Sequence, residues 1–94
     1  MSKPDVNDQL VELFRTAENA HGDAFRDTGG VHPDWPIWYA DYLFDGIREL
    51  TKAKFTRSEL IAFLVDIDKE HRQKAPKTDW PPYYAAAFLQ KFKA

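Results

Sequence analysis

Apolar residues recur at helical spacing in four separate stretches of the chain. These stretches cover about residues 7–25, 34–50, 56–72 and 79–92. Each is bounded by residues that begin or end helices, such as the paired glycines Gly29 and Gly30 after the first stretch. No stretch alternates apolar and polar residues in the manner of a strand. The pattern therefore predicts an all-α protein with four helices.

Three of the four expected helix starts carry residues that are typical N-caps. Thr56 and Glu59 form a capping box, in which each side chain binds the backbone N–H of the other residue. Asp34 and Asp79 each precede Trp-Pro, and proline in a first turn loses no needed hydrogen bond. We expect Thr56, Asp34 and Asp79 to accept hydrogen bonds from the backbone at their helix starts.

The strongest pattern is an internal repeat. Residues 34–40 match residues 79–85 at five of seven positions, and residues 9–14 align with residues 59–64. The connections are short, which favours antiparallel neighbours, and one helix pair cannot bury its own apolar face. The sequence predicts one domain, residues 1–94, folded as an up-down-up-down bundle of two helix-hairpin repeats, about 7–50 and 56–92.

The repeated motif, Asp-Trp-Pro-x-(Trp/Tyr)-Tyr-Ala, resembles one found in a set of short uncharacterised bacterial helical proteins. The segments that carry the resemblance are 32–43, 55–60, 70–71 and 79–84. The resemblance implies a bacterial origin and a stable helical fold. It implies no activity and assigns no functional residue.

Composition and charge exclude several classes of protein. The chain has no cysteine, so thiolate metal sites and disulfides are excluded, and a small domain without disulfides suits a reducing cytoplasm. No apolar stretch approaches the ~18 residues of a membrane span, so we expect no membrane contact. Residues 1–50 are acidic and residues 51–94 are basic, but the lysines are scattered. Without a basic-aromatic motif we expect no nucleic-acid binding.

The candidate site lies where the first and third helices end and the second and fourth begin. Glu18 and His21, like Asp68 and His71, form a carboxylate-x-x-His pair on the inner face of a helix. The candidate ligand or metal residues at this end are His21, His71, Glu18, Asp68, Trp35, Trp80, Tyr39 and Tyr84.

This cluster has two interpretations. Glu-x-x-His is the spacing of di-iron bundles, so Zn or Fe is one, and the aromatic residues could also line a pocket for a flat ligand. The other is structural: each histidine closes its helix and bonds to the next helix start, while the rings fill the core. The second helix offers Asp41 and Asp45 as further metal ligands, but their repeat partners are Ala86 and Gln90. We therefore expect no cofactor.

A second candidate surface lies on the back of the second and fourth helices. Ile37 and Phe44 lie nearly opposite the stripe from Trp35 to Tyr42 that we expect to be buried, and Leu89 takes the place of Phe44 in the repeat. Such a line can mark an interface with a protein partner or a second copy in a homodimer. Alternatively, the N-terminal segment or the first loop covers it.

The sequence thus leaves several classes of function possible. No set of nucleophile, base and orienting group can be assembled, so we expect no enzyme. The sequence favours a small non-catalytic accessory or protein-interaction domain. The alternative is a protein that binds a metal or a small aromatic ligand at the His/Asp/Trp end.

Overall fold

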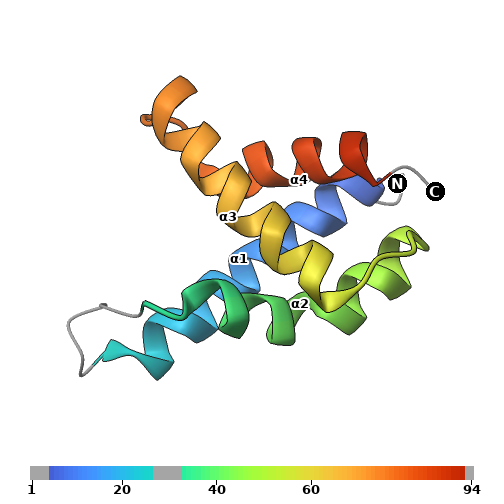
Figure 1. The fold of residues 1–94 in the computed structure, drawn as a ribbon, viewed down its shortest axis with the longest axis horizontal. Helices are drawn as coiled ribbons and strands as arrows, with labels where there is room; N and C mark the ends of the chain where they lie inside the picture. Colours follow the sequence, from blue (N-terminus) through green and yellow to red (C-terminus); the bar gives the residue numbers. More distant parts are fainter. Residues whose placement is uncertain (1–4, 27–32, 93–94) are drawn as a thin grey trace.

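Four α-helices follow one another in the structure, a computed structural model that describes residues 5–26 and 33–92 (Figure 1). They are α1 (Val6–Ala24), α2 (Trp35–Thr51), α3 (Arg57–Lys74) and α4 (Trp80–Lys91). The described segments contain no strand, and the helix bounds lie within about two residues of those expected. The prediction of an all-α fold is confirmed.

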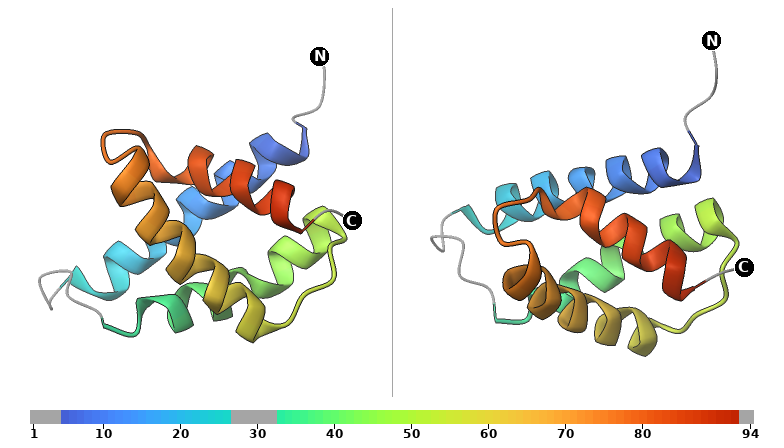
Figure 2. Two further views of the ribbon diagram at one scale, coloured as in Figure 1. Left: turned by 45° about the horizontal axis from the view of Figure 1, so that its top comes forward. Right: turned by 90° about the horizontal axis from the view of Figure 1, so that it is seen from above.

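Consecutive helices run in opposite directions and pack into one bundle (Figures 1 and 2). α1 packs against α2 and α4, and α3 packs against the same two helices from the other side. In Figure 1, α3 passes in front of α1 at an oblique angle, and α2 and α4 pack against both of these helices. The predicted up-down-up-down bundle is confirmed.

Positions related by the repeat are buried alike. Leu10 of α1 and its counterpart Leu60 of α3 are both fully buried, as are Ala40 of α2 and Ala85 of α4. The helix ends keep the same register, because the backbone N–H groups of Phe25 and Ala75 bond to the carbonyls of His21 and His71. The superposition of the two halves stays a prediction. The largest fully buried side chains are Phe14, Phe88, Leu10, Leu43, Ile47, Leu60, Leu64 and Pro81.

The buried face of α2 differs from the expected one. It is centred on Ala40, Leu43 and Ile47, while Tyr42 is 43% exposed and stacks on Trp38 at a ring distance of 5.2 Å. The expected stripe was therefore wrong at Tyr42. α2 contacts α1 on one side and α3 on the other, so its buried face is wide and turned away from Tyr42.

The helix starts that contain proline lack the side-chain cap that Thr56 provides for α3. Thr56 accepts a hydrogen bond from the backbone of Glu59, whose side chain accepts from the backbone of Thr56, so the capping box is confirmed. Asp34 and Asp79 stand at N-cap positions without a side-chain capping bond, which corrects the expectation. A capping side chain accepts from the second or third helical residue. Pro81 and Pro82 remove both donors in α4.

In α2 one of the two backbone N–H groups that a capping side chain could bind is present, but it already donates a hydrogen bond to the backbone. Pro36 removes the N–H of the second helical residue, and the N–H of Ile37 donates to the backbone carbonyl of Asp34 at 3.1 Å. The carboxylate of Asp79 instead pairs with Arg15 and so joins the start of α4 to α1.

We expect Thr56→Ala to lower the free energy of unfolding by about 1 kcal/mol, because it leaves the backbone N–H of Glu59 without its partner. Asp34→Ala is the matched control, since it removes the same kind of residue from a helix start without breaking a side-chain cap. Urea melts followed by circular dichroism measure both. Equal losses for the two variants would contradict the distinction between these caps.

Candidate ligand-binding pocket

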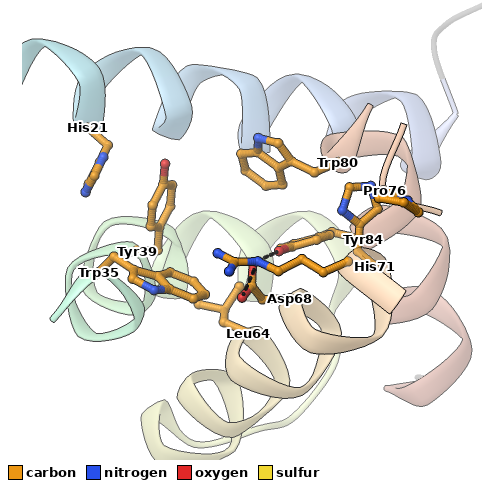
Figure 3. A pocket seen from close by; sticks show the side chains of 10 residues that line it. His21, Trp35, Tyr39, Leu64, Asp68, His71, Pro76, Trp80 and Tyr84 are labelled. Carbon is orange, nitrogen blue, oxygen red and sulfur yellow. Dashed lines mark hydrogen bonds and ion pairs between the residues drawn. The ribbon is translucent and has the colours of Figure 1, made fainter. Parts of the chain in front are cut away.

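A cavity of about 480 Å³ lies at the end of the bundle where α1 and α3 end and α2 and α4 begin (Figure 3). Seven of the eight candidate residues line it; the exception is Glu18, which bonds to one of its walls. Ten side chains from all four helices and the α3–α4 connection line it: His21, Trp35, Tyr39, Leu64, Asp68, His71, Arg72, Pro76, Trp80 and Tyr84. The repeat register therefore predicted which residues meet here.

Two Trp-Tyr pairs related by the repeat form the aromatic walls. Trp35 and Tyr39 come from α2, with ring centroids 6.0 Å apart, and Trp80 and Tyr84 come from α4, 4.7 Å apart. Tyr39 also meets Trp80 edge-on at 6.0 Å, which joins the two pairs into one surface. Each pair arises because the tryptophan and the tyrosine lie four residues apart, on the same face of a helix.

Two carboxylates hold these walls in place. Glu18 accepts a hydrogen bond from the indole N–H of Trp80. Its repeat partner Asp68 accepts one from the hydroxyl of Tyr84 at 3.3 Å and contacts Arg72 Nε at 3.2 Å. The carboxylates that suggested a metal site thus fix aromatic rings of α4. Sequence reasoning placed them correctly but did not identify these partners.

The histidines lie on opposite sides of the cavity in Figure 3. His21 stacks on Tyr39 with ring centroids 4.9 Å apart and 23° between the planes. His71 Nε2 lies 2.9 Å from the carbonyl oxygen of Thr78, the residue before Asp79, so its N–H donates across the α3–α4 connection. This contact agrees with the structural interpretation, in which the histidine bonds to the next helix start. Among residues 5–26 and 33–92 no group of three or more His, Asp or Glu is arranged to hold a metal.

The cavity walls disfavour negative charge. Burial, followed by the nearby carboxylate of Glu18, raises the pKa of Tyr39 from 10 to about 12. Burial and Asp68 raise the pKa of Tyr84 as well. Both phenols therefore stay neutral to a higher pH than an unperturbed tyrosine does.

We expect this shift to appear as alkaline destabilisation. Below pH 10 Tyr39 is neutral in both the folded and the unfolded chain, and its contribution to stability is complete. Between pH 10 and about 12 it ionises in the unfolded chain first, so the free energy of unfolding falls as the pH rises. An ultraviolet titration of the phenols combined with urea melts tests this, and Tyr39→Phe should make the pH dependence shallower. A single step near pH 10 for all tyrosines would contradict it.

The second candidate surface is not a continuous apolar line. Ile37 is 50% exposed, but Leu89 packs against the core and Phe44 meets the buried Phe55 edge-on at 5.4 Å. The guanidinium of Arg57 lies 4.6 Å from the ring centre of Phe44. Phe44 and Leu89 are thus partly buried rather than fully exposed, and at Phe44 the α2–α3 connection and the start of α3 cover part of the ring. An interface through Ile37, Phe44 and Leu89 stays a prediction. His32 and most of the first loop lie outside the described residues.

Comparison of the chain with protein families, curated proteins and solved structures finds no match. The resemblance to a set of bacterial helical proteins thus stays a prediction. Within residues 5–26 and 33–92, no helix has the length and apolarity that crossing a membrane requires.

Proposed function

We propose that the protein binds a small molecule with a flat ring in the cavity between Trp35 and Tyr39 of α2 and Trp80 and Tyr84 of α4. The observation that carries this proposal is the cavity itself: two repeat-related pairs of aromatic residues surround about 480 Å³. Ligand sites usually enclose roughly 300–1,000 Å³ and combine aromatic walls with a few polar groups. The metal alternative has no such support among the described residues.

Preorganisation of the walls supports binding. The indole of Trp80 is held by Glu18, and the hydroxyl of Tyr84 is held by Asp68. Rings that are already oriented lose less conformational freedom when a ligand binds, which raises affinity. A core that merely needed filling would gain nothing from rings arranged around an open cavity.

The interaction-domain hypothesis has less support, because the expected apolar line is interrupted. Of its three residues only Ile37 is exposed by as much as 50%. Association through a protein partner or a second copy stays a prediction from the sequence, as do the bacterial origin and the cytoplasmic location.

The proposal is tested by screening small flat fragments by NMR for saturable shifts of the cavity residues. Trp35→Leu should weaken binding of a fragment hit about tenfold, because it removes a ring contact worth about 1 kcal/mol or more. Tyr42→Leu is the matched control: it removes an aromatic ring of the same helix that is 43% exposed and does not line the cavity. Absence of any saturable hit, or equal losses for the two variants, would refute the proposal.

A further inference from the structure

The charged groups of the cavity indicate the kind of ligand that it takes. Asp68 and Arg72 are the charged residues among its ten lining side chains, and Glu18 adds a carboxylate behind Trp80. The histidines His21 and His71 also line the walls. Around the aromatic rings, the carboxylates of Asp68 and Glu18 thus outnumber the one guanidinium of the lining.

Asp68 and Arg72 differ in how firmly they are held. The side chain of Asp68 is only 23% exposed and accepts a hydrogen bond from Tyr84. That of Arg72 is 74% exposed and contacts Asp68 within a single helix turn. Exposed pairs at this spacing are weak, because they are screened by water and lose side-chain freedom. The ion pair therefore holds Arg72 only weakly, whereas Asp68 is fixed by Tyr84.

The two halves of the cavity differ at the position of Arg72. The position equivalent to Arg72 in the first repeat is Gly22, which has no side chain to compete for Glu18. Of the two carboxylates, Glu18 and Asp68, only Asp68 thus has a cationic partner, Arg72, one turn away on its own helix and in the cavity lining.

The aromatic walls add to this preference. The faces of tryptophan and tyrosine rings carry negative charge density, which attracts an ammonium or amidinium group. Besides burial, the carboxylates of Glu18 and Asp68 raise the pKa of Tyr39 and Tyr84, and these carboxylates also oppose an anionic ligand.

We infer that the cavity binds a flat-ringed cation, whose ring lies between Trp35 and Trp80 and whose charged group replaces Arg72 at Asp68. This inference rests on the proposed function and specifies its ligand class. Arg72 then acts as a resident counter-ion that competes with the ligand. Its removal should increase affinity, which is the opposite of what an anion-binding arginine would do.

Three probes with one ring and different charges test the inference: tryptamine, the neutral 3-ethylindole and the anionic indole-3-acetate. Titrations followed by NMR at low salt should give tryptamine an affinity about tenfold above that of 3-ethylindole. Indole-3-acetate should bind most weakly. Arg72→Gln should increase tryptamine affinity about two- to fivefold, the equivalent of an exposed ion pair.

Matched controls distinguish the effect of Arg72 on tryptamine affinity from the effect of the protein's total charge. Lys74→Gln removes the same charge from α3 outside the cavity lining and should leave tryptamine affinity unchanged. Asp68→Asn keeps an oxygen for Tyr84 and should abolish the preference for tryptamine, whereas Asp66→Asn should retain it.

The outcomes distinguish the two proposals. If indole-3-acetate binds most tightly, if Arg72→Gln weakens tryptamine binding, or if it acts like Lys74→Gln, the inferred cation site is wrong although a ring pocket remains. If none of the probes and none of the flat fragments binds, the proposed function is wrong as well.

Discussion

Replacement of Phe14 by alanine is expected to lower the free energy of unfolding by about 3–5 kcal/mol. Phe14 is fully buried in α1, and its ring meets Trp80 at 5.8 Å and Tyr84 at 6.1 Å, edge-on in both cases. The substitution removes apolar contacts and leaves a void behind two walls of the candidate pocket. Small domains have total stabilities of only about 5–15 kcal/mol, so the variant loses a large share.

Urea melts followed by circular dichroism measure this loss. Phe14→Leu gives a smaller, measurable loss if the alanine variant fails to fold. Ile37→Ala is the control, since it removes a large apolar side chain that is 50% exposed and should cost much less. A loss below 1 kcal/mol for Phe14→Ala would mean that α1 does not pack against α4 as the structure shows.

The helices were predictable because their signals are local. Apolar spacing gave the four segments, and the capping box of Thr56 and Glu59 fixed one start. The caps at Asp34 and Asp79 were wrong for an equally local reason. The prolines that marked these starts also removed the N–H groups that an aspartate would cap. The sequence contained that information, since Pro81 and Pro82 occupy both donor positions.

The orientation of α2 was not predictable in the same way. Its apolar residues cover most of the helix circumference, so periodicity alone does not decide which of them face the core. Contact with α1 and α3 buries Ala40 and Leu43 and brings Phe44 against Phe55, while Tyr42 is left at the surface. That choice depends on tertiary packing.

The residues that line the candidate pocket were predictable from the sequence, but the presence of a cavity between them was not. The repeat register brought His21, His71 and the Trp-Tyr pairs to one end. Whether such rings close into a core or leave a cavity depends on how far the helix ends diverge, which the sequence does not encode locally. Arg72 was missed because its pairing with Asp68 is local, but its place in the cavity lining depends on how the helices pack.

The internal repeat makes a second prediction with a large expected effect. Ala40 of α2 and Ala85 of α4 occupy equivalent positions and are both fully buried. Each small side chain allows its helix to approach the neighbouring helices closely, so a leucine there overfills the core. We expect Ala40→Leu and Ala85→Leu each to lower the free energy of unfolding by about 1–3 kcal/mol.

The comparison between these two variants tests the equivalence of the halves more directly than either loss alone. Ala86→Leu is the control, because Ala86 lies next to Ala85 but is exposed, and surface changes usually stay within about 0.5 kcal/mol. If the halves pack alike, urea melts should give similar losses at positions 40 and 85 and almost none at 86. If the leucine substitution markedly lowers the free energy of unfolding at one buried alanine but not at the other, the two halves are similar in sequence but pack differently. The symmetric assignment of pocket walls to α2 and α4 would then have to be abandoned.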